Sequence, residues 1–241
     1  MSKTHLFLSP HFDDVVGSCG GFISRLSEKG EKVYILTIFG GDSLFPLSEL
    51  ANELHLIWGA ETIVTTRRNE DTLACKKLGA ISNFLPFPDA IYRKNSLGQN
   101  LYLTIQDFRT LQKQEDNMLP YEIVCSLKNN YNISCSTIYC PMANGSHVDH
   151  ILTQKVGFLL KKEGYNVIFY QDFYYEQEEN EIFNRLSLKR IDINLSDQEL
   201  TSKINAFKCY KSQILCLFES WDSMEDYFNT VGSVETFAFF R

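Results

Sequence analysis

The chain lacks any apolar run that approaches the roughly 20 residues needed to span a bilayer. Its first apolar segment, residues 5–8, is also too short to be the core of a signal peptide. Internal repeats, low-complexity tracts and a convincing interdomain linker are missing as well. These absences predict one cytoplasmic domain over residues 1–241, with no membrane partner.

Positive charge is scarce. The sequence holds 23 lysines and arginines against 30 aspartates and glutamates, which gives a formal net charge of -7. A protein that binds nucleic acid normally presents a basic face, because it must neutralise phosphate. The charge balance therefore predicts no nucleic-acid partner, and it favours a neutral or amine-bearing small molecule over a polyanion.

Paired cysteine spacing is also missing. The chain has seven cysteines, an odd number, and none of them forms a Cys-x-x-Cys pair. This pattern fits reduced thiols that act as small buried hydrophobes. The remaining composition, 44% hydrophobic and 22% charged, is that of an ordinary globular protein.

The order of the apolar segments predicts an α/β fold. Residues 5–8 and 33–39 are expected to be strands, with an amphipathic helix over residues 15–29 between them. This βαβ unit predicts a parallel sheet with right-handed crossovers. Further strands are expected at residues 137–140, 167–170 and 236–240, and a short extended segment is expected at residues 84–87. Further helices are expected at residues 65–78, 148–162, 197–211 and 224–229, and a polar loop at residues 89–104.

The glycine-rich fingerprint of dinucleotide-binding folds does not occur where the first strand gives way to the first helix. In its place the sequence has Ser-Pro-His-Phe-Asp-Asp at residues 9–14, followed by Gly17, Gly20 and Gly21. Two carboxylates at this point would repel a pyrophosphate, so a nucleotide cofactor is disfavoured. The position still favours function, because open α/β sheets bind ligands at the carboxyl ends of their strands.

What the sequence does contain is histidine beside aspartate at two junctions between a turn and a helix. His11 and Asp14 lie three residues apart after the first strand, and Gly-Ser-His-Val-Asp-His at residues 145–150 follows the strand at residues 137–140. Imidazole nitrogen and carboxylate oxygen are both ordinary zinc ligands. Since both junctions follow the carboxyl end of a strand, the two clusters can converge on one divalent cation.

A simpler alternative needs no metal. Asp13, Asp14 and Asp149 would then only stabilise helix N-termini, and His147 and His150 would lie on the surface. Capping requires one aspartate and no histidine, however. Three of the five histidines fall beside aspartates at these two junctions, which favours a metal site.

The two clusters resemble the metal motifs of the PIG-L or LmbE-like zinc deacetylase family. Segments similar to those of its members also occur at residues 66–71, 89–93 and 208–213, so the resemblance spans roughly residues 5–215. The common family motif has proline and glutamate where this chain has Phe12 and Val15, which leaves open how the turn is braced. The resemblance implies a Rossmann-like layered fold with a mostly parallel central sheet flanked by helices, in agreement with the βαβ unit.

The resemblance also implies the chemistry of the site. His11, Asp14 and His150 would hold one Zn²⁺ per chain, with another divalent transition metal as the alternative. Three protein ligands leave an open position, and a catalytic zinc lowers the pKa of bound water to about 7. Asp13, next to a ligand but itself free, would be the general base.

Two further groups of residues receive roles in the same way. A protonated His147, held charged and oriented by Asp149, would stabilise the oxyanion and protonate the departing amine. A hydroxyl-rich sugar would be bound by charged donors and acceptors, and an aromatic ring would pack on its apolar face. The residues expected to contact the sugar are Arg67, Asp89, Tyr92 and Arg93.

The resulting expectation is a cytoplasmic enzyme that removes the acetyl group from the amide nitrogen of an N-acetylated amino sugar, or of its glycoside or conjugate. Alternatives are a deacylase of a non-sugar amide, a catalytically silent metal-containing carbohydrate-binding protein, and a non-haem iron oxygenase, because two histidines and a carboxylate also form an iron site. Asp13 and His147 favour hydrolysis over the silent protein. Nothing in the sequence sets the oligomeric state.

Overall fold

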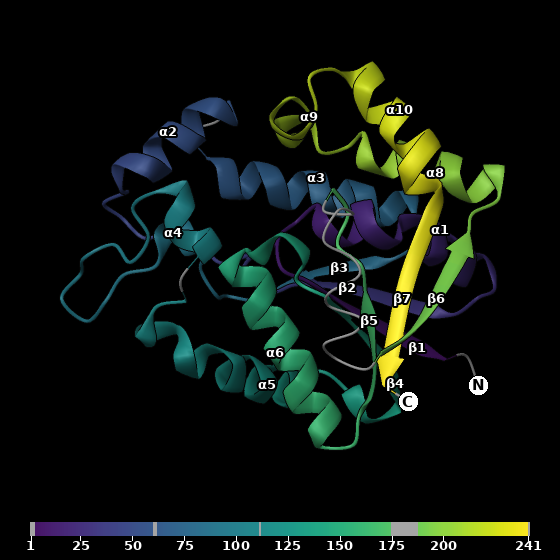
Figure 1. The fold of residues 1–241 in the computed structure, drawn as a ribbon, viewed down its shortest axis with the longest axis horizontal. Coiled ribbons are helices and arrows are strands. Elements are labelled where there is room, and N and C mark those ends of the chain that lie inside the picture. Colours follow the sequence, from purple (N-terminus) through teal and green to yellow (C-terminus); the bar gives the residue numbers. More distant parts are fainter. Residues whose placement is uncertain (1–2, 60–61, 111, 175–187, 241) are drawn as a thin grey trace.

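A seven-stranded sheet forms the centre of the molecule in this computed structural model, which describes residues 3–59, 62–110, 112–174 and 188–240 (Figure 1). The strands are β1 (Thr4–Ser9), β2 (Lys32–Thr37), β3 (Ile81–Phe84), β4 (Ser136–Pro141), β5 (Asn166–Tyr170), β6 (Leu188–Asn194) and β7 (Val234–Phe240). Their spatial order is β3-β2-β1-β4-β5-β7-β6. The order in which strands are added to the sheet therefore reverses between β1 and β4. Open α/β sheets bind ligands at such a switch point.

The first five strands of this order are parallel, and β7 runs antiparallel to both β5 and β6. The expected α/β class with a mostly parallel central sheet is thus confirmed. The strand of this region precedes the short extended segment expected at residues 84–87. β3 ends at Phe84, because it pairs with β2 directly after the turn at Gly79, whose φ is +70°. β6 has a largely exposed, polar sequence and was not expected.

Helices cover both faces of the sheet (Figure 1). In the described ranges they are α1 (Asp14–Glu28), α2 (Glu49–Ile57), α3 (Ile63–Lys77), α4 (Ile105–Thr110), α5 (Leu119–Asn130), α6 (Val148–Lys162), α8 (Asp197–Phe207), α9 (Lys211–Leu217) and α10 (Trp221–Thr230). None of them combines the length and the hydropathy that crossing a membrane would require.

Successive side chains of β1 point to opposite faces of the sheet and enter two different hydrophobic clusters. Leu6 and Leu8 point into a cluster with α5 and α6, whereas Phe7, between them, points into a cluster with α1, α3 and α8. This is the pattern of a strand whose two faces are both buried. The sheet is therefore held between two helical layers, and its strand ends are fixed in position.

The segment at residues 89–104 is only partly the polar loop that the sequence suggested. Ala90–Tyr92 forms a 3₁₀ turn whose side chains are buried in the cluster with α5 and α6. Removing these three nonpolar or aromatic side chains from water stabilises the buried position of the turn. Residues 96–99 are exposed, as expected.

The seven cysteines are free thiols. Cys19, Cys75 and Cys140 are buried, as the composition suggested. The other four are partly or fully exposed, so the prediction of buried thiols was wrong for them.

Candidate active site

The two histidine and aspartate clusters meet at the carboxyl ends of β1 and β4. These strands are neighbours, paired in parallel from Thr4 with Ser136 onward. The chain leaves β4 through a sharp turn in which Ala143 has φ 59° and Gly145 has φ 78°. This turn places the start of α6 beside the start of α1.

The turn after β1 is braced by Ser9. Its hydroxyl donates to the carbonyl oxygen of His11 (2.5 Å) and accepts from the backbone N–H of Val15 (3.2 Å). The backbone N–H of His11 in turn donates to Asp14 Oδ2 (2.7 Å). Asp13 precedes α1 but makes no capping hydrogen bond, so helix capping does not account for the paired aspartates.

His11, Asp14 and His150 come together as a set of metal-binding atoms. Asp14 Oδ2 lies 3.2 Å from His11 Nδ1 and 3.3 Å from His150 Nε2, and the three ligand atoms lie within 4.8 Å of one another. Two ligands about 2.0–2.1 Å from a tetrahedral zinc ion lie about 3.3–3.4 Å apart. The donor types and their separations therefore fit a divalent transition metal.

The local charge also favours a cation. Burial lowers the pKa of His11, but the surrounding carboxylates, led by Asp89, more than offset this effect and raise the pKa to about 10. Burial raises the pKa of Asp14, yet His150 and His11 beside it hold that pKa well below its usual range. The site thus draws positive charge into a buried position.

Asp13 lies next to this set but pairs with a different residue. Arg67 Nη2 donates to Asp13 Oδ1 (2.8 Å), and both side chains are buried. The guanidinium of Arg67 lies over the rings of Phe12 and Trp58, at 5.1 and 5.3 Å from their centroids. Phe12 therefore braces the turn through Arg67, and Arg67 contacts the expected base.

Asp149 does not orient His147 in the way that the sequence suggested. Its carboxylate contacts His11 Nε2 (3.1 Å), the backbone N–H of Ala90 (3.0 Å) and Arg93 Nη1 (2.5 Å). Only the backbone N–H of Asp149 reaches His147, where it donates to Nδ1 (3.2 Å). The carboxylate points inward because Asp149 is fully buried at the start of α6, facing Arg93.

The hydrogen bonding of His147 disfavours the protonated form that the sequence suggested, because its Nδ1 accepts from a backbone N–H. Burial lowers its pKa well below the usual range, and the nearby His11 lowers it further. Because Nδ1 accepts a hydrogen bond, the ring proton lies on Nε2. The ring packs against Phe108, with 4.8 Å between centroids.

Of the residues expected to contact a sugar, Asp89 and Arg67 line the cavity, whereas Tyr92 and Arg93 do not. The hydroxyl of Tyr92 contacts His55 Nε2 (2.6 Å), and the Arg93 guanidinium is buried between two carboxylates. Both positions follow from the 3₁₀ turn that buries this segment. This placement leaves Tyr92 and Arg93 outside the cavity lining.

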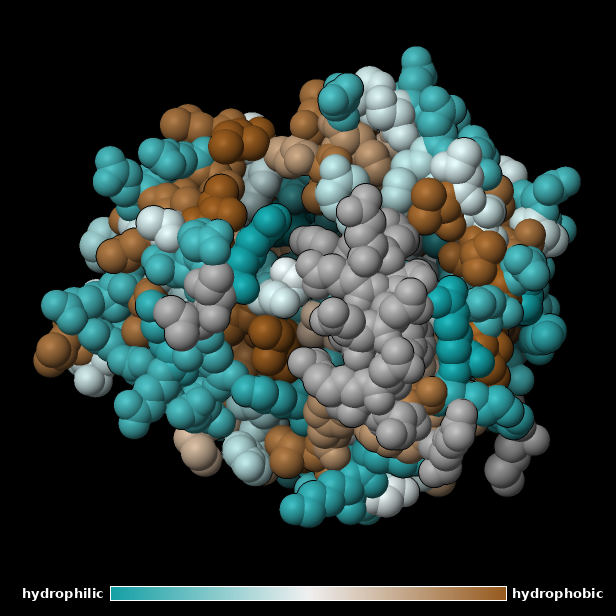
Figure 2. Space-filling view, in the orientation of Figure 1, coloured by the Kyte–Doolittle hydropathy of each residue, from teal (hydrophilic) through white to brown (hydrophobic). Residues whose placement is uncertain are grey.

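An open cavity leads to His11, Asp14 and His150, the residues that could hold a metal. Wall residues that lie outside the sequence motifs are Leu54, Trp58, Ile105, Phe108, Arg109, Cys216 and Leu217. They come from α2, α4 and α9 and the residues after α2, which are brought together only by the tertiary fold. The apolar character continues onto the surface, where Figure 2 shows apolar side chains over α2. Leu56 and Ile57 of this helix are exposed.

Asp172 is a further residue that the sequence analysis missed. It follows β5 directly and its Oδ1 lies 2.5 Å from His150 Nδ1, with both side chains buried. The rule that selected His11, namely a polar residue at the carboxyl end of a parallel strand, also selects Asp172.

The segments at residues 66–71 and 208–213 contact each other. Tyr210 donates its hydroxyl proton to Asp71 Oδ1 (2.6 Å), and Ser212 donates to Glu70 through both its backbone N–H (2.9 Å) and its hydroxyl (2.6 Å). These bonds fix α9 against α3. They therefore position the wall of the cavity that α9 contributes.

Comparison with known proteins places these features in a family. Residues 6–160 match the model of PIG-L, described as GlcNAc-PI de-N-acetylase. A 2'-N-acetylparomamine deacetylase of Niallia circulans is 33% identical over 240 residues, covering 90% of this chain and 82% of that protein.

Solved structures agree with this match. A deacetylase from teicoplanin biosynthesis superposes with a TM-score of 0.82 at 24% identity, covering 98% of this chain and 97% of the other. The N,N'-diacetylchitobiose deacetylase of Pyrococcus horikoshii has a TM-score of 0.57 at 18% identity, covering 99% and 84% of the two chains. At these identities the likeness establishes a common fold.

Proposed function

Because the chain belongs to the PIG-L family of de-N-acetylases, we propose that it hydrolyses the acetamide of an amino-sugar conjugate with a zinc ion held by His11, Asp14 and His150. The chain is an N-deacetylase of N-acetylated amino sugars, as its relatives are. The choice of zinc, the roles of individual residues and the kind of conjugate are our proposals. The observation that carries them is the close set of three ligand atoms beside the buried Asp13.

The proposed zinc ion has two effects on the reaction. A zinc ion bound there would lower the pKa of water to about 7 and polarise the amide carbonyl. The donor set of two imidazoles and one carboxylate supports this role, because three protein ligands leave a position for water or substrate.

The remaining steps belong to side chains of this protein. Asp13 accepts the proton of the attacking water, and Arg67 keeps the Asp13 carboxylate in place through its hydrogen bond. His147 donates a hydrogen bond from Nε2–H to the oxygen that gains charge as the amide carbon becomes tetrahedral. Asp13 then passes this proton to the amide nitrogen as the C–N bond breaks, which releases the free amine and acetic acid, and the acid ionises to acetate.

The cavity supports a conjugate larger than one sugar ring. The cavity is open to solvent, so parts of a substrate beyond the acetamide can extend outward from the three candidate ligands. Trp58 and Phe108 offer aromatic walls, and Asp89 and Arg109 offer charged groups for hydroxyl or amine substituents. We propose a glycosidic conjugate of the kind that 2'-N-acetylparomamine, the substrate named for one relative, represents.

Metal analysis of purified variants tests the ligand set. Wild-type protein should bind about one equivalent of zinc. His11→Ala and His150→Ala should lose that equivalent while keeping the far-ultraviolet circular dichroism spectrum of the wild type. The matched control is His55→Ala, which removes another buried histidine outside the site and should retain the metal. Folded His11→Ala and His150→Ala proteins that keep a full equivalent would contradict the assignment.

A further inference from the structure

We propose that Asp172 and Asp149 are positioning residues for the metal site, each fixing the ring orientation and proton position of one metal-binding histidine. This inference rests on the proposed function, because it assumes that His150 and His11 are ligands. It assigns Asp149 to His11, although the sequence suggested a role beside His147.

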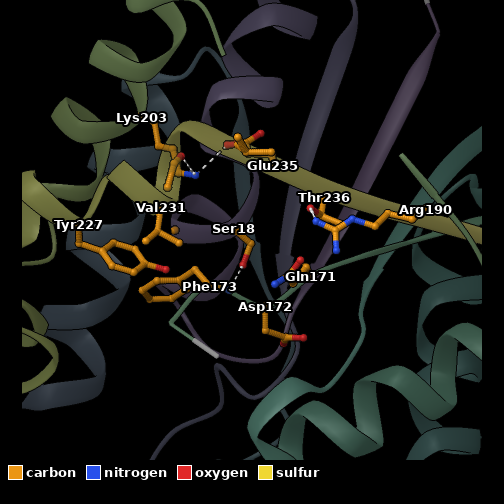
Figure 3. A pocket seen from close by; sticks show the side chains of 13 residues that line it. Ser18, Gln171, Asp172, Phe173, Arg190, Lys203, Tyr227, Val231, Glu235 and Thr236 are labelled. Carbon is orange, nitrogen blue, oxygen red and sulfur yellow. Dashed lines mark hydrogen bonds and ion pairs between the residues drawn. The ribbon is translucent and has the colours of Figure 1, made fainter. Parts of the chain in front are cut away.

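The first carboxylate, that of Asp172, is hydrogen-bonded to the ring of His150. Figure 3 shows Asp172 at one edge of a pocket, with Ser18 between it and Lys203 in this view. Its Oδ1 lies 2.5 Å from His150 Nδ1, and its Oδ2 accepts from the backbone N–H of Asn144 (3.1 Å). Both Asp172 and Asn144 are buried, so the carboxylate cannot turn to solvent. A proton on Nδ1 of His150 leaves Nε2 as the free donor atom, facing Asp14 Oδ2 at 3.3 Å.

Asp149 does the same for His11 with the opposite ring nitrogen. Its Oδ2 lies 3.1 Å from His11 Nε2, while His11 Nδ1 faces Asp14 Oδ2 at 3.2 Å. A proton on Nε2 therefore leaves Nδ1 as the donor atom. The carboxylate is itself fixed by the N–H of Ala90 and by Arg93.

The contacts that hold Asp149 in place extend to residues deeper in the protein. Arg93 pairs with Asp149 and also with Asp116 (3.0 Å), which accepts from the hydroxyl of Tyr102 (2.5 Å). These groups are buried. The segment at residues 89–93, which resembles a segment of the family, thus contacts the proposed metal site through the pair of Arg93 and Asp149. It also lines the cavity with Asp89.

The physical reason for such residues is general. A metal-binding histidine usually donates its other N–H to a carboxylate or carbonyl, which fixes the tautomer and raises the basicity of the ring. Removing that partner commonly weakens metal binding by about 10- to 100-fold. Here each histidine has its own buried carboxylate, and the two carboxylates are anchored independently.

The first test measures zinc affinity in Asp172→Asn and Asp149→Asn, by competition with a chromophoric chelator. We expect both to bind one equivalent with a dissociation constant raised by about 10- to 100-fold. The visible absorption bands of the cobalt-substituted variants should also shift from those of the wild type. Asp226→Asn changes an exposed aspartate on α10 and should alter neither quantity. Unchanged zinc affinity in both site variants would overturn the inference.

A second test requires no variant to fold, because it uses the wild type. Long-range ¹H–¹⁵N spectra of the zinc-loaded protein report which nitrogen of each imidazole carries hydrogen. We expect the proton on Nδ1 of His150 and on Nε2 of His11. Protons on the reverse nitrogens would overturn the inference.

The zinc content of four variants separates this inference from its rival and from the proposed function. His11, His147 and Asp149 also form a group that could hold a metal, in which Asp149 would be a ligand. If His147→Ala and Asp149→Asn both lose the zinc equivalent, Asp149 is a ligand and the positioning role is wrong. If His11→Ala and His150→Ala keep the zinc, the proposed ligand set has failed instead.

Discussion

Asp13 and Asp14 are adjacent in sequence but are held by different partners. Asp14 accepts from the backbone of His11 and faces two imidazole nitrogens, which is the environment of a ligand. Asp13 contacts Arg67 and stays outside the set of metal-binding atoms. The difference supports the proposed roles of Asp14 as ligand and of Asp13 as general base.

Asp13→Asn should keep the metal and lose activity. An amide cannot accept the proton of water, and removal of a general base commonly lowers the rate by about 10²- to 10⁴-fold. Zinc content and the rate of acetate release, measured on the same preparation, should therefore separate. An active Asp13→Asn enzyme would assign the proton transfer to another group, and loss of zinc would make Asp13 a ligand.

His147→Ala should lower kcat more than it raises KM. The hydrogen bond that we assign to Nε2–H forms with the charge that develops in the transition state, so its loss leaves substrate binding largely unchanged. Loss of one such donor costs about 10²- to 10³-fold in kcat. Steady-state kinetics on one amino-sugar acetamide measures both constants. A rise in KM alone would place His147 in substrate binding.

For single residues, the sequence predicted which side chains lie together at the site, but it did not predict which of their atoms face one another. The two motifs lie at strand ends, so their convergence follows from the βαβ pattern alone. Whether Asp149 faces His147 or His11 depends on Arg93, which lies 56 residues away in sequence. Side-chain direction of this kind is set by tertiary contacts that local spacing does not encode.

Among the elements, α3 and α9 are joined by buried polar contacts. Burial raises the pKa of the Asp71 carboxyl from its ordinary 3.8 to about 7, and the hydrogen bond from Tyr210 opposes this effect. The folded protein therefore retains a proton that the unfolded chain releases as the pH rises from 3.8 to about 7. Across this window Asp71 makes folding less favourable as the pH increases.

Asp71→Asn should consequently gain stability relative to the wild type as the pH rises from 4 to 7, by about 1–4 kcal/mol, and the gain should level off above 7. Urea unfolding at several pH values gives this difference. Asp192→Asn is the matched control. Burial raises the pKa of Asp192, but Arg190 and Thr236 together more than offset this and lower it, so the stability difference should have the opposite sign. A pH-independent Asp71→Asn difference would contradict the shifted pKa.

The regular elements of the fold were largely predictable, whereas the cavity walls were not. α1 and α6 follow from apolar periodicity, and the parallel core follows from their alternation with strands. α4 and α9 have only 6 and 7 residues, too few for a periodic signal. Their places depend on long-range contacts such as those of Tyr210, so the walls that they form became visible only in the structure.

At the scale of the whole molecule, the cavity combines an acidic floor with aromatic and apolar walls. The floor holds Asp13, Asp14 and Asp89 near a cation site, and the formal net charge of the chain is -7. Such a potential favours a neutral or amine-bearing substrate and opposes a polyanion. The walls add contacts remote from the acetamide, whose binding energy can orient the reacting centre.

The most direct measurement of the central claim compares acetate release from three acetamides by the zinc-loaded protein. They are a glycoside of N-acetylglucosamine linked to an aminocyclitol, N-acetylglucosamine itself, and an N-acetylated amine without a sugar. We predict that the glycoside reacts fastest, because contacts beyond the first ring help to position the amide, and that the sugar-free amide reacts slowest. Chelation should abolish release and added zinc should restore it. Faster hydrolysis of the sugar-free amide, or release that survives chelation, would contradict an amino-sugar deacetylase that works through this metal site.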